Sequence, residues 1–289
     1  MRRGDPPMTR DAHPLPLREI AYAKINLALH VRARRSDGYH ELDTLFAFAE
    51  AGDVLTARPA DTLSLTLTGP FAQDLQDEPD NLVLRAVQRL ADANGIAANL
   101  ALTLDKQLPI AAGIGGGSAD AAAALRLAQQ MWQLGPAAVQ PAAIALGLGA
   151  DVPACLVSQS CHGTGLGEQL TPAPNLGLEG LPILLVNPRW PCPTGPVFKA
   201  WDGVDRGPLC LDQWRQGRND LEPPACDLIP QIAEVIAFLR DLPGVTLARM
   251  SGSGATCFAL FSDEAQRDAA CQSLAAARPQ WWTLATRLR

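Results

Sequence analysis

Residues 109–128 read PIAAGIGGGSADAAAALRLA, and this stretch decides the fold. Four glycines fall within five positions, at Gly113, Gly115, Gly116 and Gly117, and an alanine-rich run follows directly. Glycine loses the most conformational entropy when it is ordered, whereas alanine is the best helix former. The junction therefore predicts a loop whose backbone is approached too closely for side chains, followed at once by a helix.

The flanking segments predict what the loop binds. Residues 100–109, LALTLDKQLP, place leucines at alternate positions, as in a strand, and the run after the loop has a helical apolar face. A strand, a glycine turn and a helix N-terminus together make an anion site, because backbone N–H groups point outward and the helix dipole adds positive charge. A plain tight turn needs only one or two glycines, so phosphate is the expected guest. Ser118, where we expect the helix to begin, can cap it or contact a phosphate or its metal ion.

Other phosphate-binding patterns fit less well. No lysine follows the glycines as the Walker pattern requires, and Ser118 occupies the last glycine position of the dinucleotide pattern. The acidic residue that would end the second strand of a dinucleotide fold is also missing, which disfavours an NAD-dependent dehydrogenase. The H-R-D and D-F-G signatures of protein kinases do not occur.

The composition of the chain limits the classes of molecule that it is expected to bind. The chain has 289 residues, 47% apolar and 19% charged, with a formal net charge of −6. Apart from the short run Arg32, Arg34 and Arg35 it has no basic cluster, so we expect a small-molecule substrate and no nucleic acid. No apolar run reaches membrane-spanning length, so no membrane partner is expected. The seven cysteines form no C-x-x-C pair, which predicts a reducing, cytoplasmic location without disulfides or structural zinc.

The predicted elements mix strands and helices without regular βαβ alternation, which favours an α+β fold over a doubly wound sheet. Residues 18–31 alternate as a strand, and 41–49 return after the Asp37-Gly38 turn to make a hairpin. Further strands are expected at 61–69, 100–109, 151–160, 181–188 and on both sides of a second glycine turn within 246–261. Helices are expected at 80–95, after the glycine loop, and at 141–150, 229–242 and 263–277. We expect two domains, 18–163 and 164–289, after a disordered tail at 1–17.

Two segments carry polar residues that could act in catalysis: the first strand, with Lys24 and Asn26, and the turn at Asp151. Alternation places Lys24 and Asn26 on one strand face, ~7 Å apart along the backbone. Asp151 follows a helix end at Gly149 and precedes Val152-Pro153, which we expect to be extended. From the residues alone, a solvated strand lysine and a plain turn aspartate remain alternatives.

The glycine stretch resembles the P-x-x-x-G-[LI]-G-G-G-S-[SA] loop of the GHMP kinases, which phosphorylate small alcohols from ATP. Further similar segments follow in the expected order between residues 20 and 262: AKINLALHV, DGYHELDTLF, GADVP, GxGE at Gly165 to Glu168, and MSGSGATCFALF. The resemblance implies a two-domain α+β fold with the active cleft between the domains, and ATP with Mg²⁺. Together these segments resemble a branch of the family that acts in non-mevalonate isoprenoid synthesis and phosphorylates the 2-hydroxyl of a cytidine-diphosphate-linked alcohol, and DGYHELDTLF counts against a kinase for another alcohol.

The resemblance also implies roles for individual residues. Asp151 would be the catalytic base and Lys24 its charged partner, while the loop Ser251–Gly254 would pack beside the phosphate loop. The expected ATP-phosphate site comprises Pro109, Gly113, Gly115, Gly116, Gly117 and Ser118, with Ser118 as the one named Mg²⁺ ligand and Asn81 on the adenine side or simply a helix cap. The expected acceptor site comprises Asn26, Tyr39, His40, Asp151, Thr194 and Phe198. A kinase for another alcohol, such as homoserine or mevalonate, and a non-catalytic nucleotide sensor of the same fold are the alternatives.

Overall fold

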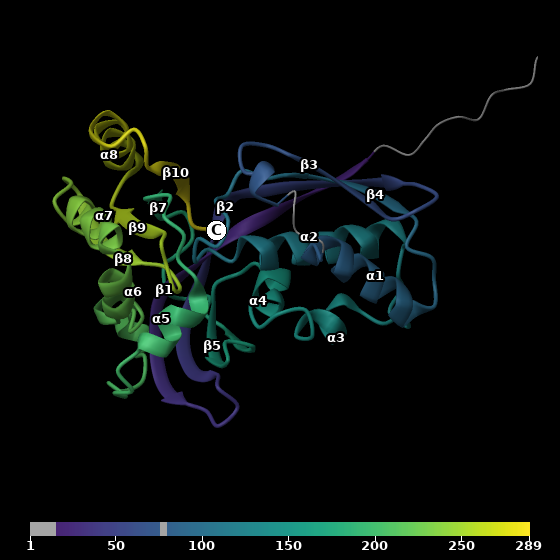
Figure 1. Cartoon of the computed structure of the whole chain (residues 1–289), viewed down its shortest axis with the longest axis horizontal. Helices are drawn as coiled ribbons and strands as arrows, with labels where there is room; N and C mark the ends of the chain where they lie inside the picture. Colours follow the sequence, from purple (N-terminus) through teal and green to yellow (C-terminus); the bar gives the residue numbers. More distant parts are fainter. Residues whose placement is uncertain (1–15, 76–79) are drawn as a thin grey trace, which may run out of the picture.

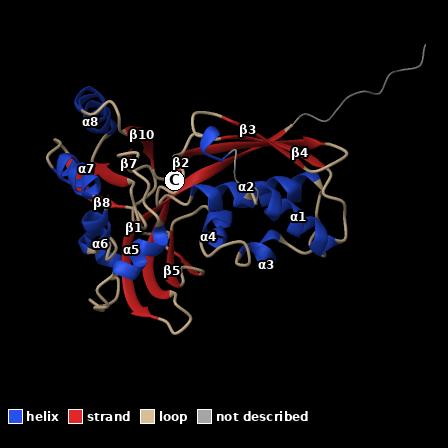
Figure 2. Cartoon of the chain, viewed as in Figure 1, coloured by secondary structure: helices blue, strands red, loops and turns tan. Residues whose placement is uncertain are grey.

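The computed structural model describes residues 16–75 and 80–289, and these form two sheets with helices beside each (Figures 1 and 2). The expected tail at 1–17 lies outside the described residues up to residue 15, and Leu17 already belongs to the first strand. Mixed sheets with helices packed beside them confirm the α+β fold class.

The first sheet is built on a long hairpin. Strands β1 (Leu17–Arg34) and β2 (His40–Pro59) pair antiparallel along their length. The predicted turn joins them, with Gly38 at a φ of 89° that favours glycine. The opposite edge of β2 pairs with β4 (Leu100–Asp105) near its end and with β5 (Cys161–Gly165) near its beginning. Strand β3 (Ser64–Thr68) adds parallel to β4, and β6 (Gln169–Pro172) adds antiparallel to β5.

The helices of this half lie together on one side of the sheet (Figure 2). They are α1 (Leu82–Asn94), α2 (Gly116–Met131), α3 (Pro141–Ala145) and α4 (Val152–Val157), with a short 3₁₀ turn, η1, at Gln73–Leu75. As predicted, α1 ends at Gly95, in the left-handed conformation. Helix α2 buries a run of alanines, Ala121 to Ala124, against α1 and the sheet. Their small side chains let the helix that follows the glycine loop sit close to the strands.

The second sheet has the order β10-β7-β9-β8, formed by β7 (Pro182–Asn187), β8 (Val245–Met250), β9 (Cys257–Phe261) and β10 (Trp282–Arg287). Its half also contains α5 (Thr194–Ala200), the 3₁₀ segment η2 (Leu211–Gln216), α6 (Glu222–Leu228), α7 (Pro230–Arg240) and α8 (Glu264–Ala277). Strands β8 and β9 flank the second glycine turn, as the sequence predicted.

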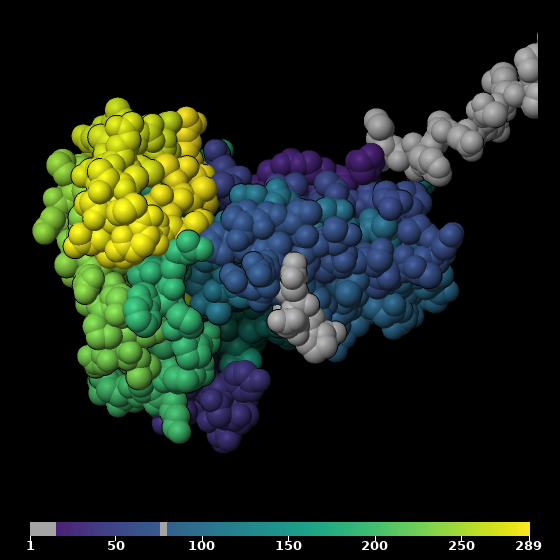
Figure 3. Space-filling model, turned by 45° about the horizontal axis from the view of Figure 1, so that its top comes forward, coloured from purple at the N-terminus to yellow at the C-terminus, as the bar shows by residue number. Residues whose placement is uncertain are grey.

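The two sheets share a hydrophobic core. Ile25 and Leu27 of β1 belong to one buried cluster with Ile183 of β7 and Phe258 of β9. The chain end returns to the first sheet through a bridge between Leu288 and Ala49. In the space-filling view the tip of the β1–β2 hairpin projects beside the C-terminal half (Figure 3). The two halves are therefore joined by apolar contacts between the β1–β2 hairpin and the second sheet.

Three sequence-based expectations differ from the structure. Residues 151–160 are not a strand, because Val152–Val157 form α4 and Asp151 itself has helical φ and ψ of −83° and −16°. Pro153 lies in the first helical turn, where its missing N–H costs nothing, so the proline favours a helix start here. The helix expected at 141–150 ends at Ala145. Helix α2 begins at Gly116, which puts Ser118 inside its first turn and not at the cap.

The sheets also bear on the domain boundary that we expected at residue 163. Strands β5 and β6 belong to the first sheet, and the second sheet starts at Pro182. We therefore propose that the boundary lies between Pro172 and Pro182.

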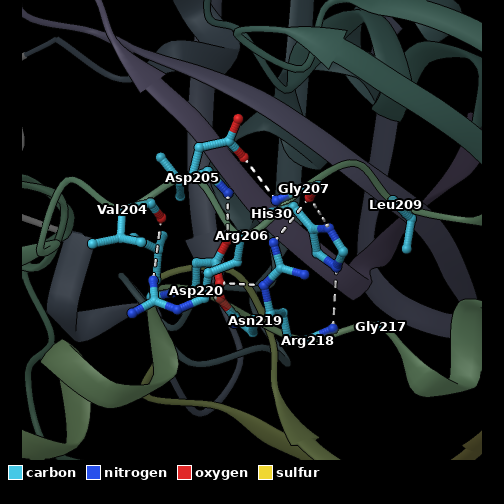
Figure 4. A network of polar contacts seen from close by, with 12 residues as sticks. His30, Val204, Asp205, Arg206, Gly207, Leu209, Gly217, Arg218, Asn219 and Asp220 are labelled. Atoms are coloured by element: carbon cyan, nitrogen blue, oxygen red, sulfur yellow. Dashed lines mark hydrogen bonds and ion pairs between the residues drawn. The ribbon is translucent and has the colours of Figure 1, made fainter.

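Segment 202–220 lies along the edge of β1 that does not pair with β2, and hydrogen bonds connect the two (Figure 4). Leu29 exchanges backbone hydrogen bonds with Arg218 and Asp220, and the Asp220 carboxylate accepts from Val31 N at 2.8 Å. His30 Nδ1 lies 3.1 Å from the Gly207 carbonyl, while Arg218 N–H donates to His30 Nε2 at 3.2 Å. An accepting Nε2 and a donating Nδ1 require a neutral imidazole.

This segment makes the fold sensitive to acid at His30. Burial, and then Arg218, lower the pKa of His30 below its ordinary 6.5. Since the unfolded chain then binds the proton more tightly, His30 costs stability as the pH falls through about 6.5. We expect the melting temperature to fall less between about pH 8 and pH 5.5 in His30→Gln, whose amide can make both contacts without titrating. Equal acid sensitivity of the two proteins would contradict this reading.

Candidate active site

A cavity of about 920 Å³ opens between the β1–β2 hairpin, the glycine loop, the start of α4 and helix α5. Every residue that the sequence analysis assigned to the site lines it: Lys24, Asn26, Tyr39, His40, Asn81, Pro109, Gly113, Gly115, Gly116, Gly117, Ser118, Asp151, Thr194 and Phe198. Residues from both halves of the chain thus line one concave site.

Lys24 and Asp151 form an ion pair at the cavity wall. Lys24 Nζ lies 2.9 Å from Asp151 Oδ2 and donates to Asn26 Oδ1 at 3.1 Å. The Lys24 side chain is only 5% exposed, whereas that of Asp151 is 36% exposed and so can reach a ligand. The pair presents an accessible carboxylate with an immobilised ammonium behind it.

Contacts from β2 and the glycine loop hold Lys24 and Asn26 in this position. The Asn26 amide donates to Thr44 Oγ1 at 2.8 Å, and Thr44 in turn donates to the Ala28 carbonyl. Lys24 N donates to the Ile114 carbonyl of the glycine loop at 3.0 Å, and Lys24 Nζ lies 4.7 Å from the centre of the Phe46 ring. Two-residue alternation could place Lys24 and Asn26 on one face, but only the fold supplies Phe46 and Thr44 behind them.

Three of the four glycines in the loop each face a different neighbour, and the fourth faces none. A Cβ on Gly113 would lie 2.5 Å from the Ser251 carbonyl oxygen, and Gly113 has a φ of 73°. A Cβ on Gly115, at a φ of 64°, would lie 3.0 Å from Lys24 Cε, and one on Gly116 would lie 3.2 Å from Lys106 Nζ. Gly117 has nothing within 4 Å of that position and lines the cavity. Close neighbours and a positive φ thus favour glycine at 113 and 115, Gly116 is in tight contact with Lys106, and Gly117 faces open space.

The second glycine turn packs against the first, as the resemblance implied. Ser251 Oγ donates to the Gly113 carbonyl at 3.0 Å and accepts from Asn26 N at 3.1 Å. Thr256 N donates to the Ala112 carbonyl. Ser251 therefore ties the glycine loop to the strand that carries Lys24.

Lys106, Asp53 and Asp120 form a charged cluster that the sequence analysis missed. All three side chains are at most 3% exposed. Burial raises the pKa of Asp120 to about 7 against the opposing effect of Lys106. Burial alone would lower the pKa of Lys106, but Asp120 and Asp53 outweigh it and raise that pKa. Nothing in the spacing of positions 53, 106 and 120 indicates that they meet, so the cluster carried no sequence signal.

Aromatic residues gather at the other end of the cavity. The His40 ring lies 5.1 Å from that of Phe198 and 5.7 Å from that of Trp201, measured between centres. Tyr39 is 61% exposed beside them. Burial, and then the charge of Arg34, lower the pKa of His40, which favours a neutral ring. This end offers flat aromatic surfaces together with the hydrogen-bonding groups of His40 and Tyr39.

Two further predicted residues also have structural contacts. Thr194 Oγ1 lies 3.0 Å from Ser253 Oγ, which joins α5 to the second glycine turn. Asn81 caps α1 by accepting from Val83 N at 2.9 Å, the plainer of its two predicted roles, although it also lines the cavity. Ser118 makes no capping bond.

The described residues contain neither a cluster of metal-ligating side chains nor a helix that could span a membrane. Within 16–75 and 80–289, no three His, Cys, Asp or Glu side chains gather in a way that could hold a metal ion. None of the helices in these same ranges has the length and apolar character needed to cross a membrane.

Comparison with known families decides the relationship. The model for the GHMP kinases N terminal domain matches residues 81–159, and that for the GHMP kinases C terminal matches residues 204–280. The chain belongs to the GHMP kinase family. Within it, the 4-diphosphocytidyl-2-C-methyl-D-erythritol kinase of Rhizorhabdus wittichii is 57% identical to this GHMP kinase over 277 residues, 94% of each chain.

Solved structures agree with this relationship. A crystal structure of 4-(cytidine 5'-diphospho)-2C-methyl-D-erythritol kinase superimposes with a TM-score of 0.80 at 35% identity, covering 94% of this chain and 99% of that one. The homoserine kinase of Cytophaga hutchinsonii superimposes with a TM-score of 0.66 at 15% identity, covering 99% and 98%. The second likeness shows the shared fold alone.

The different surroundings of Gly113 and Gly117 predict opposite effects on stability when each is replaced by alanine in this GHMP kinase. Gly113→Ala places a methyl against the Ser251 carbonyl at a positive φ, so we expect a lower melting temperature. Gly117→Ala meets no protein atom and favours the helix, so its melting temperature should be unchanged or higher. Its ATP dissociation constant, measured by calorimetry, should nevertheless rise roughly tenfold, because the methyl occupies space left for phosphate. Unaltered ATP binding by Gly117→Ala would place the phosphates elsewhere.

Proposed function

We propose that this GHMP kinase transfers the γ-phosphate of ATP to the 2-hydroxyl of 4-diphosphocytidyl-2-C-methyl-D-erythritol, in non-mevalonate isoprenoid synthesis. The observation that carries the proposal is the Lys24–Asp151 pair, 2.9 Å apart, in one cavity with both the open glycine loop and the aromatic end. A kinase needs these three parts: an anion site for the donor, a proton acceptor, and a binding surface for the rest of the alcohol.

The glycine loop is the donor site in this proposal. The first amides of α2 lack partners within the helix, and Gly116, Gly117 and Ser118 of this turn line the cavity, so a phosphate bound there can accept from them. Asn81 and Pro109 line the same cavity and extend the donor site toward the adenine. Catalysis then depends mainly on holding the phosphate in line with the hydroxyl.

Asp151 is the base in this proposal and Lys24 its partner. An alcohol is a poor nucleophile, so a carboxylate that accepts its proton assists the attack. The Lys24 ammonium, fixed by Asn26 and Phe46, stabilises the negative charge that develops on the oxygens being exchanged. Lys24 also contacts the glycine loop through its backbone. It therefore fixes the position of the base relative to the donor site.

Mg²⁺ is the metal we propose for the donor. Ser118 lines the cavity directly after Gly117, and a single hydroxyl there fits an ion that takes most of its ligands from phosphate oxygens and water. When bound, the ion would neutralise phosphate charge. Within the described residues no three His, Cys, Asp or Glu side chains gather as a metal site, which is compatible with such sparse protein ligation.

The aromatic end is the proposed acceptor site. Tyr39 and Phe198 can stack on a pyrimidine while the neutral His40 ring bonds its edge, and Asn26 and Thr194 line the path to Asp151. Homoserine and mevalonate have no base to occupy this surface. We also propose a cytoplasmic location, since all seven cysteines are free.

Replacement of the base should separate binding from chemistry. Asp151→Asn is expected to bind both substrates nearly as well as the unaltered protein but to lose roughly 10²- to 10⁴-fold in kcat, because the amide cannot take the proton. Single-turnover kinetics and calorimetry measure the two effects. Asp92→Asn, on the exposed face of α1, is the control that removes the same charge away from the cavity. An Asp151→Asn protein with normal turnover would exclude this mechanism.

The acceptor assignment is tested by direct competition. Purified protein with ATP and Mg²⁺ should phosphorylate the cytidyl compound far faster than free methylerythritol phosphate, homoserine or mevalonate, as measured by product mass. Phe198→Ala should weaken use of the cytidyl compound roughly tenfold, since stacking is worth ~1 to 3 kcal/mol per base, and leave the KM for ATP unchanged. Trp190→Ala, an exposed aromatic outside the cavity lining, is the matched control. Preference for any of the other three alcohols would overturn the assignment.

A further inference from the structure

The buried cluster beneath the glycine loop is not explained by the Lys24–Asp151 mechanism. Lys106 follows the end of β4, and its ammonium contacts Asp53 of β2 and, at 2.7 Å, Asp120 Oδ2 of α2. The Lys106 side chain is 2% exposed. One ammonium therefore links β2, β4 and the first turns of the helix that begins at the glycine loop.

The two carboxylates in this cluster are held very differently. Asp53 Oδ1 accepts from the backbone N–H groups of Gln107 and Leu108, at 2.6 and 2.8 Å, while its Oδ2 meets Lys106. Asp120 has only the Lys106 contact, and its Oδ1 is buried without a hydrogen-bond partner. Asp53 thus anchors Lys106 to the sheet, and the Asp120 contact connects that anchor to α2.

The cluster lies directly behind the proposed phosphate site. A Cβ on Gly116 would come within 3.2 Å of Lys106 Nζ, so the ammonium occupies the space where residue 116 has no side chain. Lys106, Asp120 and Gly116 all line the cavity. Two aspartates against one lysine give the cluster a formal charge of −1 beside a site for an anion, and without Lys106 that charge would be −2.

We infer that Lys106 is a positioning residue for the nucleotide phosphates: it pins the first turns of α2 to the sheet and offsets the buried negative charge beneath the glycine loop. The inference rests on the proposed function, because it takes the glycine loop to be the donor site. Its effect is electrostatic as well as mechanical, since interactions between charges are strong where water is excluded.

Two variants separate this role from a merely structural one. Lys106→Met and Asp120→Asn both break the Lys106–Asp120 ion pair, so both are expected to lower the melting temperature. They change the cluster charge in opposite directions, to −2 and to 0. At about pH 8.5, Lys106→Met should raise the dissociation constant of a non-hydrolysable ATP analogue with Mg²⁺ roughly tenfold or more. Asp120→Asn, whose amide oxygen can still accept from Lys106, should lower it.

Steady-state kinetics give a second readout. Lys106→Met should raise the KM for ATP while the KM for the acceptor alcohol and kcat at saturating ATP change less than about threefold, because Lys106 touches neither Asp151 nor the aromatic end. Asp105→Asn is the matched control, since Asp105 precedes Lys106 in the chain but does not line the cavity. It should leave nucleotide affinity within about twofold of the unaltered protein.

The outcomes are distinguishable. Weaker nucleotide binding by both Lys106→Met and Asp120→Asn, in proportion to their loss of stability, would overturn the electrostatic role. Unchanged affinity in folded Lys106→Met would overturn the inference altogether. If Lys106→Met does not fold, Asp120→Asn still decides, because weaker binding by that variant contradicts the inference. Failure of the unaltered protein to bind the ATP analogue would instead refute the proposed function.

Discussion

The close contact between two glycine turns is the constraint on which the rest of the site depends. Gly113 and Gly252 lie backbone against backbone, and Ser251 bonds both the glycine loop and the strand that carries Lys24. A side chain at Gly113 would push apart the two glycine turns, because its Cβ would lie 2.5 Å from the Ser251 carbonyl oxygen. The same contact holds the glycine loop in place at the start of α2, where Gly116 and Gly117 line the cavity.

Charge is distributed around this contact in two layers. At the cavity wall, Lys24 is paired with an accessible carboxylate, which suits a base that must reach a hydroxyl. Beneath the loop, Lys106 is paired with two buried carboxylates, which suits a group that must stay in place. Glycine is needed between them because both ammonium-bearing chains approach the loop, Lys24 at Gly115 and Lys106 at Gly116. The loop sequence thus reflects its neighbours as much as its ligand.

Sequence reasoning succeeded where the information was local. Alternation predicted the β1–β2 hairpin, and the glycine junction predicted a strand, a loop and a helix in that order. It fails at 151–160, where the apolar residues around a proline predict a strand although Pro153 fits the first turn of a helix. It also missed β5, β6 and β10, short strands that form because a neighbouring strand is already in place.

The sequence by itself determined the fold class, the glycine loop and the residue types offered to the site, because periodicity and glycine content act over a few neighbouring positions. Only the tertiary structure decided which glycines are required by packing and which one is left open, since that depends on Ser251, Lys24 and Lys106 arriving from elsewhere. It also decided that Asp53, Lys106 and Asp120 form one cluster. Lys106 lies 53 residues from Asp53 and 14 residues from Asp120 in the sequence. The sheet and helix α2 bring the three side chains together, and no local sequence pattern encodes this contact.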